Sequence, residues 1–195
     1  MSEVSEGASK TEQRAAALAR RLALPDEARS AAAAAIAART LPFAVPQDAI
    51  VAGYAPIRGE IDPFPLMRAL SALGARLALP VVTGQGRPLL FRAWSEAEAL
   101  ARSPLGILEP PQGAAEIVPD IVLVPLAAFD TLGHRIGYGA GYYDCTLAAL
   151  RASRRIIAAG LAFAVQQIEV VPAAAHDVAL DYVITERETL IFRSR

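Results

Sequence analysis

The stretch Asp120-Ile121-Val122-Leu123-Val124-Pro125 decides the fold. Four consecutive apolar residues stand here between an acidic residue and a proline, without polar alternation. Such a short, fully apolar run is typical of a strand buried on both faces of a parallel sheet. A glycine-rich stretch and then a helix over residues 141–153 follow it. A buried strand, a glycine-rich loop and a helix in this order indicate an α/β fold.

Similar apolar runs and helical patterns lie on both sides of this stretch. Helices are predicted over residues 10–24, 25–39, 63–73 and 95–101. Strands are predicted over residues 49–54, 76–82, 88–94, 155–160 and 182–185. Residues 1–9 read as a flexible lead-in, and residues 102–119 as a surface loop. Helices alternating with short apolar strands predict one domain over residues 1–195, a three-layer sandwich with a mainly parallel open sheet flanked by helices.

Composition excludes several classes of protein. The chain has 195 residues, of which 54% are hydrophobic and 20% charged, with a net charge of -1. This excludes global disorder and argues against broad nucleic-acid binding. Cys145 is the only cysteine, so neither an intramolecular disulfide nor a cysteine-rich metal cluster is expected. Residues 1–11 lack the apolar core of a secretory signal, and residues 31–38 are too short to span a bilayer. We expect a soluble, cytoplasmic protein, a monomer with no membrane or nucleic-acid partner.

The candidate site is the stretch Gly137-Tyr138-Gly139-Ala140-Gly141-Tyr142-Tyr143-Asp144. Glycines at alternate positions let the backbone approach a ligand closely and allow the positive φ values that aim N–H groups at one anion. The N-terminus of the following helix favours phosphate at the same place. The spacing is neither a G-x-G-x-x-G fingerprint nor a P-loop. On the glycines alone, a flexible turn capping a helix is an equally good interpretation.

The charged neighbours favour a phosphate site. Arg135 precedes the glycines, and Asp144 follows them in the first helical turn. Asp144 is suited either to stabilise the helix dipole or to hold Mg²⁺, which prefers one or two carboxylates plus substrate oxygens. Lys10 is the only lysine among nineteen basic residues, and an ammonium binds phosphate as a compact point charge.

The run P-x-x-x-F-D…G-x-R-x-G-x-G-x-G-Y-Y-D, from residue 125 to residue 144, resembles the signature of the 5-formyltetrahydrofolate cyclo-ligase family. The resemblance extends over nearly the whole chain. Lys10-x-x-x-Arg14 is similar to the N-terminal basic pair of that family, and residues 54–62 are similar to its second motif. Residues 79–82 and 106–110 stand in the expected order, and Asp177 lies in a segment that resembles the source of a second metal carboxylate.

The resemblance implies an enzyme that uses ATP and Mg²⁺ to convert 5-formyltetrahydrofolate to 5,10-methenyltetrahydrofolate, with release of ADP and phosphate. It implies the following ATP-binding residues: Lys10, Arg14, Arg135, Gly137, Tyr138, Gly139, Ala140, Gly141, Tyr142 and Tyr143. It implies these folate-binding residues: Tyr54, Glu60, Tyr138, Gly139, Ala140, Gly141 and Tyr142. Asp144 and Asp177 are the implied metal ligands, and no residue is assigned as catalytic.

The chain departs from the family pattern at a few positions. Cys145 stands where many relatives have a basic residue, so one phosphate contact is missing or comes from another arginine such as Arg135. Ala140 replaces a glycine of more glycine-rich versions, and Leu126 replaces the usual glycine after the strand's proline. These departures bear on rate and affinity more than on the family.

Several single residues have plainer interpretations. His134 is more simply a solvated turn residue than a general base, and Cys145 is a small packing residue. His176 is suited either to orient the Asp177 carboxylate or to form a surface polar pair with it. Of Tyr142 and Tyr143, one is expected to pack inward and the other to line the site, because adjacent helical residues point about 100° apart. Two alternative functions stay open: a non-catalytic folate- or nucleotide-binding relative, and a phosphosugar isomerase or CoA-transferase-like enzyme.

Overall fold

The computed structural model describes residues 9–174 and 177–192. At its centre lies β6 (Ile121–Pro125), the strand predicted from the quoted apolar run, with all its residues buried. It pairs in parallel with β1 (Ile50–Ala52) on one side and with β9 (Ile157–Leu161) on the other. Strands border β6 on both sides and helices cover both faces of the sheet, which explains why the whole run is apolar.

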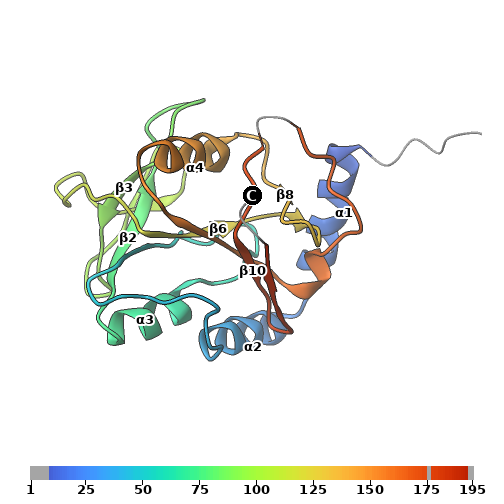
Figure 1. Cartoon of the computed structure of the whole chain (residues 1–195), viewed down its shortest axis with the longest axis horizontal. Helices are drawn as coiled ribbons and strands as arrows, with labels where there is room; N and C mark the ends of the chain where they lie inside the picture. Colours follow the sequence, from blue (N-terminus) through green and yellow to red (C-terminus); the bar gives the residue numbers. More distant parts are fainter. Residues whose placement is uncertain (1–8, 175–176, 193–195) are drawn as a thin grey trace, which may run out of the picture.

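The sheet has seven strands in the order β11-β10-β9-β6-β1-β2-β3 (Figure 1). β2 (Arg76–Val81) and β10 (Tyr182–Ile184) continue the parallel arrangement outward. The two edge strands, β3 (Leu90–Ala93) and β11 (Thr189–Ile191), are antiparallel to their neighbours. The predicted mainly parallel open sheet is confirmed, whereas β11 was not predicted, because three residues next to the chain end give almost no periodic signal.

Helices cover both faces of this sheet, as predicted. α4 (Tyr142–Ser153) lies on one face, and α2 (Asp26–Ala37) and α3 (Phe64–Ala72) lie on the other (Figure 1). α2 and α3 pack against each other as well as against the sheet. The predicted three-layer α/β arrangement is therefore confirmed.

Alternate residues of β6 supply the two halves of the core. Val122 and Val124 pack in the cluster that contains Leu147 of α4. Ile121 and Leu123 point to the other face and pack in the cluster formed with α2 and α3. Each such aliphatic side chain, fully buried, contributes about 1.5–3 kcal/mol. One strand thus holds the two helical layers together.

α1 (Lys10–Leu22) stands apart from these layers, beside the sheet. It packs against the short helix η1 (Ala164–Gln166) and against β7 (Ala128–Phe129). Its first turn is closed by a capping box, in which the Ser9 hydroxyl accepts from the backbone N–H of Glu12 and the Glu12 carboxylate accepts from that of Ser9. Ser9 is thus a helix cap rather than part of a flexible lead-in, and the rest of the predicted lead-in lies outside the described residues.

The predicted helix over residues 95–101 is wrong. The Glu98 carboxylate accepts from the Ser95 backbone N–H, as in a capping box, but the Glu98 N–H donates to the Ser95 backbone carbonyl, and the two residues close a single turn. The indole Nε1 of Trp94 donates to the Glu98 carbonyl at 3.1 Å and occupies an acceptor that a longer helix would use. The chain then enters β4 (Ala101–Arg102), which pairs with β5 (Leu108–Glu109) inside the segment predicted as a loop.

A small hairpin between β6 and α4 was also not predicted. β7 pairs antiparallel with β8 (Arg135–Ile136). The Asp130 carboxylate closes the turn by accepting from the backbone N–H groups of Leu132 and His134. This hairpin returns the chain to the carboxyl end of β6 and so places Arg135 beside the glycine-rich loop.

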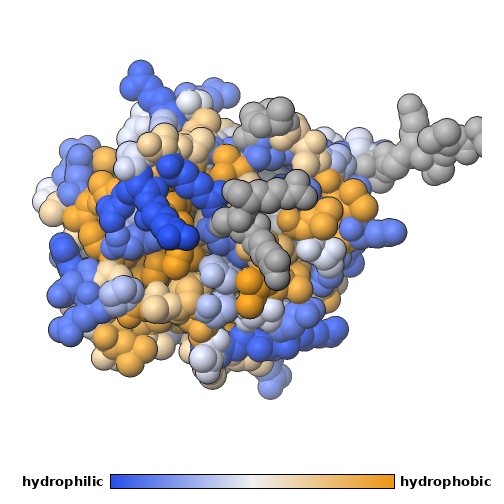
Figure 2. All heavy atoms as spheres, in the orientation of Figure 1, coloured by the Kyte–Doolittle hydropathy of each residue, from blue (hydrophilic) through white to orange (hydrophobic). Residues whose placement is uncertain are grey.

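Among the described residues, the exposed large apolar side chains are spread over several elements. On the face in Figure 2, apolar and polar residues are interspersed. The most exposed large apolar side chains, Leu73, Leu132 and Ile191, lie on different elements. None of the helices in the described part of the chain is long and apolar enough to cross a bilayer.

Candidate functional site

A cavity of about 580 Å³ lies beyond the carboxyl ends of the central strands. Pro125 at the end of β6, Pro80 near the end of β2 and Tyr54 just after β1 all line it. Ligands of open α/β sheets bind at this edge. Every residue predicted for the site lines this cavity: Lys10, Arg14, Tyr54, Glu60, Arg135, Gly137, Tyr138, Gly139, Ala140, Gly141, Tyr142, Tyr143, Asp144 and Asp177.

The glycine-rich loop forms one wall of the cavity. Gly139 and Gly141 have φ values of 94° and 69°, a backbone region that favours glycine. Gly141 is also the N-cap of α4, so the helix begins at the cavity. Gly137 does not share this conformation, and two of the three glycines therefore have the predicted positive φ.

At one end of the cavity, which we call the charged end, Lys10 and Asp177 form an ion pair. The Lys10 ammonium lies 2.6 Å from the Asp177 carboxylate, with the two side chains 30% and 14% exposed. On the next turn of α1, the Arg14 Nε donates to the Gly137 carbonyl at 2.7 Å. The first turns of α1 thereby place two cations beside the glycine-rich loop.

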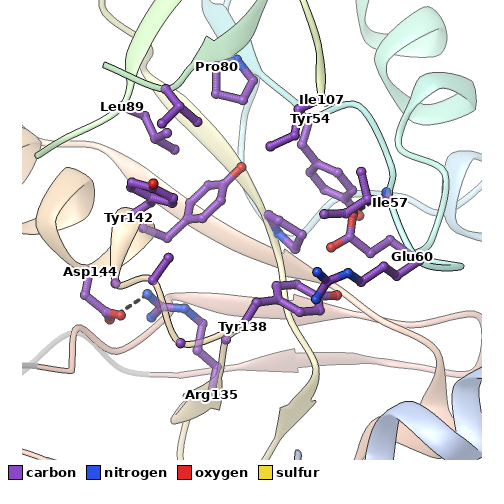
Figure 3. Close-up of a pocket in the computed structure, with 18 of the residues that line it drawn as sticks. Tyr54, Ile57, Glu60, Pro80, Leu89, Ile107, Arg135, Tyr138, Tyr142 and Asp144 are labelled. Atoms are coloured by element: carbon purple, nitrogen blue, oxygen red, sulfur yellow. Dashed lines mark hydrogen bonds and ion pairs between the residues drawn. The ribbon is translucent and has the colours of Figure 1, made fainter. Parts of the chain in front are cut away.

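Arg135 and Asp144 form the second ion pair of the charged end, 2.7 Å apart (Figure 3). The Arg135 side chain is only 4% exposed, against 26% for Asp144, and it also donates to the Val178 carbonyl. Burial lowers the pKa of the Arg135 guanidinium from its ordinary value, and the Asp144 carboxylate opposes that shift. Arg135 is therefore the more deeply buried partner of this ion pair and holds the Asp144 carboxylate in place.

The two carboxylates predicted to hold a metal lie close together. The backbone N–H of Val178, next to Asp177, donates to the Asp144 carboxylate at 3.1 Å. No cluster of three or more His, Cys, Asp or Glu side chains suited to a metal exists among the described residues. Such a pair fits Mg²⁺, which is bound by one or two carboxylates together with substrate oxygens. His176 lies outside the described residues.

The opposite end of the cavity, which we call the tyrosine end, contains Tyr54, Glu60 and Tyr138 (Figure 3). The Tyr54 ring is buried, and its hydroxyl donates to the Ile61 carbonyl at 2.9 Å. The Glu60 carboxylate is buried too and accepts from the backbone N–H of Ile57 at 2.8 Å. Desolvation raises the pKa of Glu60, while the hydrogen bond from the Ile57 N–H, the neighbouring Tyr138 hydroxyl and the nearby charge of Arg21 oppose the rise.

Tyr142 and Tyr143 both line the cavity, so the expectation that one of them packs away from it is wrong. Both rings also contact the core cluster on the α4 side of the sheet. Burial raises the pKa of the Tyr143 hydroxyl. Because α4 begins at the cavity, both tyrosine side chains line the cavity and both also pack against the core.

An apolar wall connects the two ends, and sequence reasoning assigned it no role. It is formed by Pro80, Val82, Leu89, Leu105 and Ile107. These residues come from β2, the start of β3 and the β4–β5 segment, which only the tertiary fold brings together. An apolar wall between two polar ends suits a flat organic ligand with charged groups at one side.

His134 and Cys145 are not among the cavity residues. The His134 Nδ1 lies 3.0 Å from the Asp130 carboxylate, inside the hairpin turn. Cys145 is partly buried in the first turn of α4. His134 lies in a turn as predicted, but its ring is bonded to Asp130 and not simply solvated, whereas the packing interpretation of Cys145 agrees with its position.

Comparison with known proteins identifies the relatives of this chain. The sequence profile of the 5-formyltetrahydrofolate cyclo-ligase family matches residues 6–186. A 5-formyltetrahydrofolate cyclo-ligase of Mycolicibacterium smegmatis is 32% identical over 94% of this chain and 96% of its own length. One of Escherichia coli K12 is 33% identical over 69% of this chain and 76% of its own length.

Solved structures agree with the sequence comparison. The NMR structure of Aquifex aeolicus 5,10-methenyltetrahydrofolate synthetase has a TM-score of 0.75 and 29% identity, over 95% of this chain and 94% of that chain. A 5,10-methenyltetrahydrofolate synthetase of Mycoplasma pneumoniae has a TM-score of 0.72 and 25% identity, over 92% and 99%. With the predicted motifs gathered at one cavity, these matches show that the chain belongs to the 5-formyltetrahydrofolate cyclo-ligase family.

Proposed function

We propose that this cavity carries out the reaction of the cyclo-ligase family, the ATP-dependent conversion of 5-formyltetrahydrofolate to 5,10-methenyltetrahydrofolate. The observation that carries the proposal is the shape of the site. One cavity has cations and a glycine-rich loop at one end, a buried carboxylate among tyrosines at the other, and an apolar wall between them. ATP phosphates fit the first end, and a folate ring fits the second together with the wall.

The chemistry explains why both substrates need one cavity. The formyl oxygen attacks the γ-phosphorus of ATP, and the bond to the ADP oxygen breaks. The formyl carbon of the resulting iminophosphate is electrophilic, so N10 attacks it and closes the five-membered ring. Phosphate then leaves with the former formyl oxygen, and the proton of N10 is lost. Phosphoryl transfer of this kind depends chiefly on positioning and on neutralising charge.

At the charged end, Lys10, Arg14 and Arg135 together with residues 137–143 bind ATP in this proposal. Lys10 and Arg14 reach the cavity from α1 and act directly on phosphate oxygens. The buried Arg135 contributes mainly by holding Asp144 in place. Backbone N–H groups at the start of α4 complete the anion site.

Asp144 and Asp177 would hold a Mg²⁺ ion, which neutralises phosphate charge when it is bound. Both carboxylates lie at the charged end. The Asp144 carboxylate accepts from the backbone N–H of Val178, the residue that follows Asp177 in the sequence. Lys10 beside Asp177 and Arg135 beside Asp144 keep these two acidic side chains balanced by cations. The local net charge therefore stays low before any phosphate arrives.

At the tyrosine end, Glu60 binds the folate ring. The ring carries adjacent N–H donors, and a carboxylate accepts two parallel hydrogen bonds from such a pair. Tyr54, Tyr138 and Tyr142 provide aromatic surface beside it, and residues 139–141 serve both ligands. We include in the proposal that the enzyme acts in the cytoplasm as a monomer. Light scattering of the purified protein tests the monomeric state.

The direct test incubates the purified protein with 5-formyltetrahydrofolate, ATP and Mg²⁺ and follows methenyl product and ADP together. We expect equal amounts of the two products, and ADP release that requires the folate. The absence of folate-dependent ADP would overturn the proposed reaction. Binding of both ligands without turnover would instead identify a non-catalytic relative. An isomerase or CoA-transferase activity, the other alternative, is not favoured by the family match.

A further inference from the structure

Thr146 is a buried threonine of α4 whose two hydrogen-bond partners both line the cavity. It is only 1% exposed and is not itself among the cavity residues. Its hydroxyl donates to the Tyr142 carbonyl at 2.6 Å and accepts from the backbone N–H of Leu89 at 2.8 Å. Tyr142 begins α4, and Leu89 belongs to the apolar wall. One buried hydroxyl therefore connects two sides of the cavity.

The two hydrogen bonds of Thr146 differ in what they join. A threonine hydroxyl commonly bonds to the carbonyl four residues earlier in its own helix, so the bond to Tyr142 is an ordinary helix feature. The bond from Leu89 comes from a residue 57 positions away in the sequence and joins α4 to the segment that leads into β3. Thr146 therefore holds a part of the chain that lies outside its own helix.

The place of Leu89 in the chain explains why its N–H needs this acceptor. Leu89 stands one residue before β3, so its N–H lies outside the ladder that pairs β3 with β2. The preceding residues 85–88 are exposed, whereas Leu89 is buried. A buried backbone N–H without an acceptor is costly. The Thr146 hydroxyl supplies the acceptor and fixes the first buried residue after an exposed turn.

Leu89 and Tyr142 lie on the same side of the cavity (Figure 3). Both also pack in the core cluster on the α4 side of the sheet, Leu89 as a buried and Tyr142 as a partly buried member. The position of Leu89 relative to the start of α4 therefore determines how wide the cavity is on this side. Without the Thr146 hydroxyl, packing alone would hold the two residues together.

We propose that Thr146 is a positioning residue for folate binding: its hydroxyl holds Leu89 of the apolar wall at a fixed place beside Tyr142, and so sets the width of the space for the flat folate ring. This inference rests on the proposed function, because the folate ring is there the ligand of the wall. A gap of about 0.5–1 Å already forfeits a quarter to a half of an atomic contact, so a flat ring binds well only to a wall that is held in place.

The test compares Thr146→Val and Thr146→Ser with the wild type by calorimetric titration with 5-formyltetrahydrofolate in the absence of ATP. Valine has nearly the shape of threonine but no hydroxyl, whereas serine keeps the hydroxyl. We expect Thr146→Val to weaken folate binding about tenfold, the value of one hydrogen bond, and Thr146→Ser to stay within about threefold of the wild type. Wild-type affinity in Thr146→Val would overturn the proposal.

ATP binding separates a displaced wall from a general loosening of the site. In Thr146→Val the first turn of α4 keeps its backbone bonds, such as that from Cys145 to the Gly141 carbonyl, so ATP affinity should change by less than about threefold. In steady-state kinetics the KM for the folate should rise while kcat stays within about threefold, because the wall contacts the ring in the ground state and the transition state alike. Equal losses of affinity for both ligands would overturn the proposal.

Thr185→Val is the matched control for lost stability. Thr185 is also 1% exposed, and its hydroxyl donates to the Glu188 carbonyl and accepts from the backbone N–H groups of Arg187 and Glu188. It follows β10, near the edge of the sheet opposite β3, and does not line the cavity. Urea denaturation should show that both valine variants are destabilised, whereas folate binding should weaken only in Thr146→Val. Weakened binding in both variants would point to stability alone and overturn the proposal.

Thr146→Cys, studied in reducing buffer, keeps the proposal testable if Thr146→Val fails to fold. A thiol is a weak acceptor, so this variant should bind the folate about threefold more weakly than Thr146→Ser, and equal affinity of the two would overturn the proposal. Wild-type protein that binds the folate without turnover removes the proposed reaction but leaves the role of Thr146 to stand on these binding data. Wild-type protein that does not bind the folate overturns the role of Thr146 as well.

Discussion

The two ends of the cavity differ in the partners of their charged side chains, which are opposite charges at the charged end and neutral polar groups at the tyrosine end. At the charged end each carboxylate pairs directly with a cation, Asp177 with Lys10 and Asp144 with Arg135. At the tyrosine end the Arg21 guanidinium donates to the Tyr138 hydroxyl, the Glu60 carboxylate accepts from a backbone N–H, and both Arg21 and Glu60 are buried without an ion-pair partner among the described residues. Partly exposed pairs can exchange partners when a ligand arrives, whereas buried charges tied to fixed dipoles cannot move cheaply. For the proposed function, the comparison predicts an adaptable phosphate site beside a rigid folate site.

The largest expected effect comes from Lys10→Gln, which removes an ammonium from the charged end. We expect kcat to fall about 10²–10³-fold, a typical loss for a group that stabilises developing charge. Folate affinity should stay within about threefold of the wild type, because the tyrosine end is untouched. Steady-state kinetics and calorimetry measure the two quantities. Lys10→Arg, which keeps the charge but spreads it over a planar group, should lie between the two proteins.

The second prediction compares the two ion pairs of the charged end. Asp144→Asn leaves the buried Arg135 without its charge partner and should lower the free energy of unfolding by about 2 kcal/mol, less than for a fully buried pair because Asp144 is partly exposed. Asp177→Asn should cost no more than about 1 kcal/mol, since water can solvate Lys10. Urea denaturation of both variants provides the measurement. Equal losses would contradict the different burial of the two pairs.

The third prediction concerns pH and the tyrosine end. Burial raises the pKa of Glu60 above its ordinary 4.5, so the folded state holds this proton more tightly than the unfolded state. The corresponding stability is fully present below pH 4.5 and is lost as pH rises through the folded-state value. Relative to Glu60→Gln, the wild type should therefore lose stability as pH increases above 4.5. Denaturation of both proteins at several pH values tests this, and a constant difference would be inconsistent with a buried, ionising Glu60.

The smallest expected effect is that of Cys145→Arg, which introduces the basic residue that the family resemblance leads us to expect at this position. Cys145 does not line the cavity. A cation there can act on phosphate only from a distance, where water and salt screen it. We therefore expect the KM for ATP to change by less than about threefold. A tenfold decrease would show that the charged end lacks a phosphate contact that position 145 can supply.

Much of the fold was predictable because its strands are buried on both faces. The apolar run of residues 121–124 predicts a central parallel strand, and neighbouring runs predict most of the others. The hairpin around Asp130 was missed because strands of two residues leave no periodic pattern. The helix predicted after Trp94 was wrong because a single indole hydrogen bond ends the turn, which no local pattern reveals.

The charged end was easier to predict than the tyrosine end. Lys10 is the only lysine, and Asp144 follows a glycine-rich loop, so composition and spacing both single them out. Arg21 is one of three arginines in α1 and looks like its exposed neighbour Arg20. Only its spacing of eleven residues from Lys10 was a usable signal. Within the apolar wall, Pro80, Val82 and Ile107 belong to segments that the family resemblance placed in order without a role. Leu89 and Leu105 left no signal, because only tertiary packing brings them to the cavity.

The position of α1 also has a consequence for protein synthesis. This helix leaves the ribosome first among the described elements, whereas its partners near Val165, Val170 and Asp177 leave it much later. Lys10 meets a residue 167 positions later, a delay of roughly ten to thirty seconds at ordinary rates of translation. The strands β1, β2 and β3 can pair during that interval, but both ends of the cavity have to wait. A nascent chain can therefore pair β1, β2 and β3 early, whereas we expect it to bind either substrate only after the segment around Asp177 has emerged.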